Sequence, residues 1–322
     1  MEFRSIDNKG TVEGYCLVKT ADKKINVKGA AYLDLVLSDR TGDIGAKLWD
    51  YKDEIHAWIK PSTLIKVRGV VSEYNGAEQM KIERARPVTD IDNIRIEDFV
   101  PSAPYGNTEM FDTLVECVNS FKNTELKGLV LGILNDKKEI MLYCPAAFKL
   151  HHAVRGGLLY HTLSIVRLAQ QACVIYPFLD RDLLLAGAIL HDVAKTEEFE
   201  ITPTGIVTNY TVDGTLIGHL VRGAMIVENK ARELNVDKET AMLLEHMLIS
   251  HHGEPEYGAA MRPMLLEADV LSQLDMLDAR VNEVQTALSS AEKGGFTQRQ
   301  WALDNRKFYK HSDTASTDAK LF

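Results

Sequence analysis

Histidine and aspartate side chains of the kind that bind metal ions recur through the C-terminal two thirds of this chain. Each lies beside an apolar stretch with helical periodicity. A single histidine in such a place is more often a structural residue than a ligand, but several in one domain are harder to explain that way. The set comprises His161, the pair His191-Asp192, His219, the pair His251-His252, and Asp275 with Asp278.

The pair His191-Asp192 has the most informative setting. It follows Leu183–Leu190, an almost unbroken apolar segment. Burial of that segment brings an imidazole and a carboxylate to the edge of the core, where unpaired polar groups are costly unless they bind something. Lys195 comes four residues after His191, so we expect both side chains on one helix face.

Imidazole and carboxylate groups without a thiolate suit Mn, Fe, Co, Zn or Mg rather than a cysteine-rich structural zinc site. Some assignments stay open. Asp275 and Asp278 are three residues apart on one helix face, and His151-His152 could be ligands, face a substrate or lie in a surface loop. His246 lies about 140° around the helix from His251, so we expect it to face elsewhere.

Short strands with alternating apolar residues precede this region. The predicted order along the first 86 or so residues is three strands, a short helix at Tyr51–Trp58, and two strands joined by a hairpin at Asn75-Gly76. This is the order of an OB-fold barrel. The predicted strands begin at Gly10–Thr20 and continue with Ala31–Ser38, Ile44–Trp49, Leu64–Tyr74 and Glu78–Arg84.

Residues 87–105 hold three of the nine prolines and no sustained period, which indicates a linker. From Thr108 onward the pattern is helical almost throughout. The predicted helices are Met110–Leu134, Gly157–Ile175, Arg181–His191, Thr215–Leu234, Lys238–Ser250 and Met264–Ala291.

Basic and aromatic residues share the outward phase of the second to fourth predicted strands. Such a face suits sequence-tolerant binding of single strands, because bases stack on rings while cations follow the phosphates. The alternative is that Trp49 covers the end of the barrel and the lysines are merely solvated. The candidate residues are Tyr32, Lys47, Trp49, Lys66 and Arg68.

His161, His191-Asp192 and Asp275 resemble the H…HD…D signature of the HD superfamily of metal-dependent phosphohydrolases. His219 and His251-His252 resemble the extra ligands of its two-metal members. The chain is more narrowly similar to the YhaM-type 3′–5′ exoribonucleases. That similarity rests on segments 151–162 (HHAVRGGLLYHT), 190–195 (LHDVAK), 249–253 (ISHHG), 274–279 (LDMLDA) and 299–310 (RQWALDNRKFYK).

The resemblance implies an all-β OB-fold domain followed by an all-α HD domain. We expect an OB domain at 1–88, a linker at 89–106, an HD domain at 107–312 and a flexible tail at 313–322. It favours Asp275 over Asp278 as a ligand and implies two divalent ions, manganese first, with Asp192 and Lys195 catalytic. The predicted metal ligands are His161, His191, Asp192, His219, His251, His252 and Asp275.

Composition limits where such a protein works. No run of about 18 apolar residues and no signal peptide is present, and the four cysteines are scattered, which indicates a cytoplasmic protein without membrane contact. The net charge is −9. Since an acidic chain is not drawn to nucleic acid by its overall field, a local groove in the nearly neutral N-terminal domain must supply the attraction.

The leading hypothesis is a metal-dependent 3′–5′ exonuclease that hydrolyses single-stranded RNA, with single-stranded DNA as a further substrate. One alternative is a phosphohydrolase or phosphodiesterase for free or cyclic nucleotides. Another is a non-catalytic single-strand-binding protein with a degenerate HD domain. A homo-oligomer is compatible with the sequence, which leaves the oligomeric state open.

Overall fold

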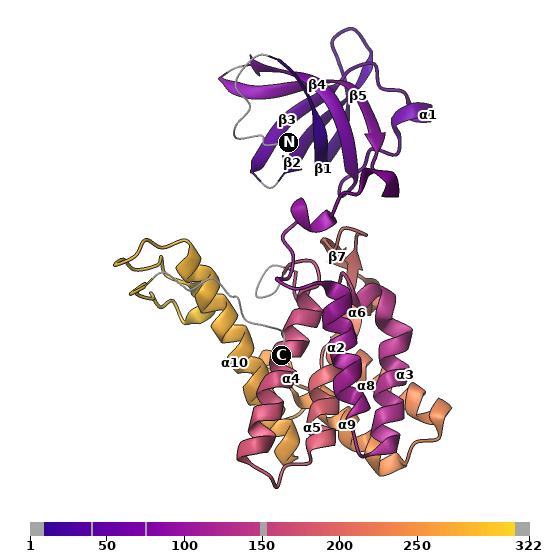
Figure 1. The fold of residues 1–322 in the computed structure, drawn as a ribbon, viewed down its shortest axis with the longest axis vertical. Helices are drawn as coiled ribbons and strands as arrows, with labels where there is room; N and C mark the ends of the chain where they lie inside the picture. Colours follow the sequence, from indigo (N-terminus) through magenta and orange to yellow (C-terminus); the bar gives the residue numbers. More distant parts are fainter. Residues whose placement is uncertain (1–9, 40, 75, 149–152, 313–322) are drawn as a thin grey trace. The chain divides into compact units, whose positions relative to one another are not determined.

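The computed structural model describes residues 10–39, 41–74, 76–148 and 153–312 of the 322-residue chain. It divides into two compact units, Met1–Ser102 with Thr202–Ile206, and Ala103–Ile201 with Val207–Phe322. Each unit has its own hydrophobic core. The first is built mainly from strands and the second mainly from helices, as the sequence predicts (Figure 1).

The N-terminal strands form a closed barrel in the order β1-β2-β3-β5-β4. Neighbouring strands are antiparallel except β3 and β5, which are parallel. Five strands closed in this way are an OB-fold, which confirms the predicted fold. The elements are β1 (Thr11–Ile25), β2 (Ala31–Asp39), β3 (Gly42–Leu48), the short helix α1 (Asp53–His56), β4 (Leu64–Tyr74) and β5 (Ala77–Pro87).

Alternating leucines determine which face of β2 points into the barrel. Leu33, Leu35 and Leu37 are buried in the barrel, while the residues between them are only partly covered. The turn that follows is set by Asp39, whose carboxylate accepts hydrogen bonds from the backbone N–H of Thr41 (2.8 Å) and Gly42 (3.2 Å).

The C-terminal unit packs its helices around one core, with nine of the ten residues of α5 buried. No helix in the described part of the chain is both long enough and apolar enough to cross a membrane. The helices are α2 (Asn107–Asn119), α3 (Thr124–Met141), α4 (Gly157–Ile175), α5 (Arg181–Leu190), α6 (Lys195–Glu198), α7 (Val212–Leu216), α8 (Gly218–Leu234), α9 (Lys238–Ser250) and α10 (Leu266–Ser289).

Two of the predicted helices are each broken in two. The expected helix Met110–Leu134 ends at Asn119, because the carboxylate of Asp182 accepts hydrogen bonds from the backbone of Lys122 (2.6 Å) and Asn123 (2.8 Å). The side chain of Asn123 then caps α3. The expected helix Thr215–Leu234 is interrupted at Gly218, whose φ of +74° is left-handed.

The sequence pattern also missed a small hairpin between α6 and α7. It consists of β6 (Phe199–Ile201) and β7 (Val207–Tyr210), which pair antiparallel. Three- and four-residue strands are too short to show a period.

Asp182 makes the break between α2 and α3 testable. Asp182→Ala is expected to lower the free energy of unfolding by about 1–3 kcal/mol, because the backbone N–H groups of Lys122 and Asn123 lose their charged acceptor. Urea titration followed by circular dichroism measures the change. Asp112→Ala, at an exposed position on α2, is the control. Equal stability of both variants would show that the contact does not hold the break.

Candidate metal centre

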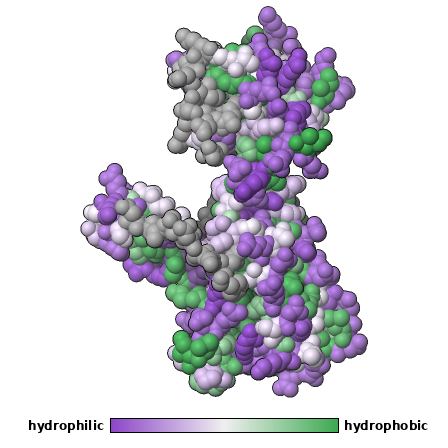
Figure 2. Space-filling model, viewed as in Figure 1, coloured by the Kyte–Doolittle hydropathy of each residue, from purple (hydrophilic) through white to green (hydrophobic). Residues whose placement is uncertain are grey.

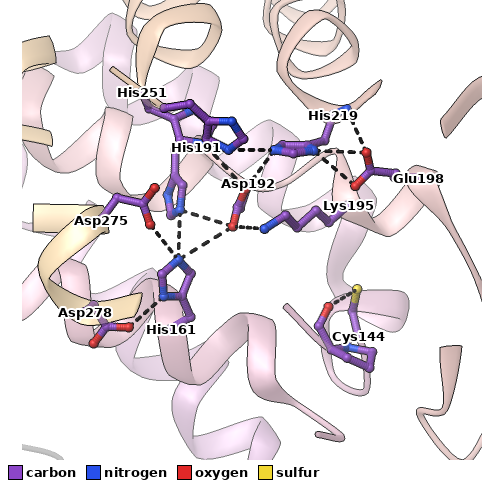
Figure 3. Close-up of polar contacts among 12 residues, drawn as sticks. Cys144, His161, His191, Asp192, Lys195, Glu198, His219, His251, Asp275 and Asp278 are labelled. Carbon is purple, nitrogen blue, oxygen red and sulfur yellow. Dashed lines mark hydrogen bonds and ion pairs between the residues drawn. The ribbon is translucent and has the colours of Figure 1, made fainter. Parts of the chain in front are cut away.

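Five helices bring the predicted metal-binding residues to one place. Figure 3 labels all of these residues except His252. Helix α4 contributes His161, and α10 contributes Asp275. The other ligand candidates lie at helix ends. His191 caps the C-terminus of α5 and is followed by Asp192, and His251 caps the C-terminus of α9 and is followed by His252. His219 is the second residue of α8.

The start of α4 depends on a glycine. Gly156 has a φ of +70°, and a Cβ atom there would lie 2.3 Å from the side-chain oxygen of Asn107. Only glycine fits this turn. Its conformation places His161 one turn into the helix, with its ring fully buried.

Asp192 lies between two groups of these side chains. Its Oδ2 is 3.6 Å from Nε2 of His161 and 3.3 Å from Nε2 of His191. Its Oδ1 is 3.5 Å from Nε2 of His219 and 3.7 Å from Nε2 of His251. One carboxylate oxygen therefore faces each group.

The two groups are completed by one further residue each. In the first, Nε2 of His161 is 3.1 Å from Oδ1 of Asp275 and 3.3 Å from Nε2 of His191. In the second, Nε2 of His219 is 3.4 Å from Nε2 of His252. Imidazole nitrogens this close to one another are typical of ligands that converge on a cation.

The other ring nitrogen of each histidine faces an acceptor. Because a carbonyl or carboxylate oxygen accepts the hydrogen bond, Nδ1 carries a proton in each ring, and in the neutral form of the ring Nε2 presents its lone pair. The Nδ1 contacts are His161 to Asp278 (2.7 Å), His191 to the Ala188 carbonyl (2.9 Å), His219 to Glu198 (3.0 Å), His251 to the Leu248 carbonyl (2.7 Å) and His252 to the Tyr257 carbonyl (2.9 Å).

Two buried atoms at the centre have no hydrogen-bond partner among the described residues. They are Oδ1 of Asp192 and Nε2 of His251. An unpaired lone pair in the interior is costly unless a cation takes it up. The converging nitrogen and carboxylate lone pairs therefore fit a divalent ion of the Mn, Fe, Co or Zn type.

Neighbouring charges shift the pKa values of groups at the centre. Burial lowers the pKa of His161, but hydrogen bonds with Asp275 and Asp278 outweigh it and raise that pKa to about 9. Burial also raises the pKa of Asp192, yet the Lys195 charge and His191 hold it well below its ordinary value. A cation that binds here displaces the proton from His161 and meets an ionised carboxylate.

Lys195 differs in part from its predicted placement. His191 and Lys195 do not share a helix, because α5 ends at Leu190 and α6 begins at Lys195. The ammonium group of Lys195 is 2.6 Å from Oδ2 of Asp192 and compensates its buried charge. Lys195 therefore lies at the centre, but through a turn rather than through helical spacing.

The remaining sequence candidates take different places. Asp278 contacts Nδ1 of His161 and not the converging nitrogens, so it orients a ring while Asp275 faces the centre. The Nε2 atom of His246 accepts a hydrogen bond from the backbone of Met264, away from the centre as expected. His151 and His152 lie outside the described residues.

Glu198 was missed by sequence reasoning. Its carboxylate accepts hydrogen bonds from both the ring Nδ1 and the backbone N–H of His219. A glutamate in the run T-E-E-F-E has no distinctive sequence signal. Its partner His219 lies 21 residues later, and only the fold brings the two side chains together.

Removal of Glu198 is expected to weaken metal binding. Glu198→Ala leaves the ring of His219 free to rotate, and loss of such an orienting carboxylate typically costs about 10–100-fold in metal affinity or activity. Isothermal titration with Mn²⁺ measures it, with Glu200→Ala, an exposed strand position, as control. If both variants bind Mn²⁺ equally well, Glu198 does not position His219.

A cavity of about 760 Å³ opens beside these side chains. This volume is within the range of roughly 300–1,000 Å³ that small-molecule sites occupy. Its wall includes Lys195, His219, His251 and Asp275, together with the aromatic residues Phe148, Phe199, Tyr210 and Tyr257.

The five predicted nucleic-acid-binding residues of the barrel fall into two sets with different partners. Tyr32 and Trp49 stack with ring centroids 4.6 Å apart, and Nζ of Lys47 lies over both rings. Lys66 and Arg68 lie on β4 and pair with carboxylates, Glu13 at 2.9 Å and Glu83 at 3.8 Å. Trp49 is 36% exposed.

Comparison with known proteins agrees with this architecture. The HD-domain family model matches residues 158–280, and a helicase model, TraI_2, matches residues 102–182. Proteins named 3′-5′ exoribonuclease YhaM from Bacillus licheniformis and Bacillus subtilis are each 39% identical over 299 residues, 93% of this chain and 94% of theirs. This chain belongs to the YhaM family. The YhaM protein of Halalkalibacterium halodurans is 36% identical, over 93% of this chain and 92% of its own.

Membership of the YhaM family agrees with the two-unit fold, because the identity extends over both the barrel and the helical unit. The HD domain implies divalent-metal binding, and the His and Asp cluster of this YhaM-family chain could hold such an ion.

Proposed function

We propose that this chain is a divalent-metal-dependent 3′–5′ exoribonuclease, with single-stranded DNA as a second substrate. The observation that carries the proposal is the convergence of five histidine Nε2 atoms with the carboxylates of Asp192 and Asp275, beside a cavity. The relatives are named 3′-5′ exoribonuclease, which supports that part of the proposal. The four cysteines are free, three of them buried, which favours the cytoplasm.

The two groups of side chains would hold two ions, for which we propose manganese. His161, His191 and Asp275 would bind one; His219, His251 and His252 would bind the other. Asp192 would bridge them, since each of its oxygens faces one group. Two bound ions would supply Lewis-acid stabilisation of the negative charge that develops during phosphodiester hydrolysis.

The chain's own residues would orient the ligand rings and neutralise negative charge. Asp278 and Glu198 hold the rings of His161 and His219 with their Nε2 atoms turned to the centre. Lys195 lines the cavity, where its ammonium would stabilise negative charge that develops on the phosphoryl oxygens. Because Lys195 also pairs with Asp192, we expect it to move toward the substrate once cations neutralise that carboxylate.

The OB-fold barrel would bind the single strand. The stacked rings of Tyr32 and Trp49 offer a surface for bases, and Lys47 beside them a cation for phosphates. Lys66 and Arg68 would contribute less, because each already has a carboxylate partner.

A nuclease assay on 5′-labelled single-stranded RNA tests the proposal. Activity is expected with Mn²⁺ and to disappear with chelator, with products that shorten progressively from the 3′ end and slower digestion of a 3′-phosphorylated strand. Mg²⁺ and Co²⁺ are assayed in parallel. Large internal fragments at early times contradict the exonuclease assignment. Faster hydrolysis of free or cyclic nucleotides than of RNA points instead to a nucleotide phosphohydrolase.

A further inference from the structure

The segment that follows α10 has no part in the proposed metal chemistry. Residues 292–310, here called the C-terminal arm, fold back on themselves through the bridges Phe296–Tyr309 and Gln300–Arg306, with the short 3-10 helix η5 (Trp301–Leu303) between them. In Figure 1 the arm is yellow and stands at the end of α10, away from the other helices.

Large aromatic side chains of the arm are exposed to solvent. Trp301 is 74% exposed, Phe296 64% and Tyr309 50%. In Figure 2 this region, at the left of the view, carries green hydrophobic residues between purple hydrophilic ones. Three exposed rings in fourteen residues are unusual for a surface that binds nothing.

The arm is also basic within an acidic protein. It has five Lys and Arg residues against two acidic ones, a net charge of +3, whereas the whole chain has −9. Lys307 is exposed and has no carboxylate partner in the part of the chain that the structure describes. Arg299 and Lys310 donate to backbone carbonyls rather than to carboxylates. Arg306 pairs with Asp304 at 3.5 Å, so Arg299, Lys307 and Lys310 are the three cations of the arm that the described residues leave without a carboxylate partner.

The base of the arm forms part of the cavity beside the metal centre. Ala302, Leu303 and Asp304 line it together with His219, His251 and Asp275. Leu303 is buried, and Asp304 pairs with Arg280 of α10 at 3.1 Å, so the arm is anchored there. Exposed Trp301 directly precedes the lining residues.

We propose that the C-terminal arm binds the stretch of single-stranded RNA just upstream of the nucleotide in the cavity. Bases would stack on Trp301, Phe296 and Tyr309, and phosphates would lie against Lys307 and Arg299, since exposed rings between cations are what sequence-tolerant single-strand binding requires. A protein partner is less suited, because protein interfaces are depleted in lysine. This inference rests on the proposed function and assigns a second RNA contact to it.

The test uses the full chain with Trp301→Ala and Lys307→Ala. Matched controls are Phe178→Ala, an aromatic ring that is 72% exposed outside the cavity wall, and Lys238→Ala, an exposed lysine that opens α9. Fluorescence anisotropy with labelled RNA in chelator gives Kd without turnover. Steady-state kinetics in Mn²⁺ gives KM and kcat for an oligonucleotide and for a dinucleotide.

Trp301→Ala is expected to raise Kd and KM for the oligonucleotide about tenfold, with kcat for the dinucleotide unchanged. Lys307→Ala is expected to reduce the slope of log Kd against log salt by about 0.7. Neither control changes these values.

Unchanged Kd and salt slope in both variants overturn the inference, whatever the activity. A change in sedimentation mass without a change in Kd assigns the arm to self-association and also overturns it. An inactive wild-type chain whose Kd still depends on Trp301 refutes the proposed function alone.

Discussion

Asp192→Ala is expected to reduce nuclease activity to background and to remove most of the bound metal. The physical reason is that, among the residues that the structure describes, Asp192 is the carboxylate with an oxygen toward each group of histidines, so its loss removes an anionic ligand from both proposed ions at once. Metal content by mass spectrometry and cleavage of 5′-labelled RNA measure the two effects, and circular dichroism is expected to show a retained fold.

Two further variants make this result specific. Asp192→Asn keeps the shape of the side chain while removing its charge, and is expected to lose activity as well. Asp112→Ala, on the exposed side of α2, is expected to retain activity and metal. An active Asp192→Ala protein with full metal content would refute the assignment of the centre.

Removal of residues 1–88 is expected to raise the RNA concentration for half-maximal rate about 100-fold, since each stacked base contributes about 1–3 kcal/mol and the barrel offers two stacked rings. Turnover of a very short substrate should change little, because all the proposed ligands lie in the helical unit. That unit has its own hydrophobic core, so we expect the fragment to fold. Kinetics on long and short RNA measure the effect.

Point variants in the barrel show how much of this loss of RNA binding each residue accounts for. Trp49→Ala is expected to reproduce part of it. Lys47→Ala should reduce the salt dependence of binding more than Lys66→Ala, because Lys66 is already paired with Glu13. If a folded fragment degrades long RNA with unchanged half-saturation, the barrel does not bind the RNA and has another role.

Local patterns were enough to predict the outline of the fold. Alternating residues such as Leu33, Leu35 and Leu37 show a strand within a few positions, and the apolar run Leu183–Leu190 shows a buried helix. They failed where a distant residue intervenes, as at Asp182, whose carboxylate ends α2 from about sixty positions away. Hydrogen bonds from two backbone N–H groups to one distant carboxylate leave no periodic pattern in the sequence.

The sequence by itself determined the OB-fold barrel, the helical unit and the residue types of the metal centre, because side-chain chemistry and short-range periodicity are local properties. Only the tertiary structure decided which atoms meet. It separated Asp275 from Asp278 by the nitrogen of His161 that each contacts, supplied Glu198 to His219, and brought Lys195 to Asp192 through a turn. Ring orientation and hydrogen-bond partners depend on how helices cross, and helices that are remote in sequence cross at places that no local pattern encodes.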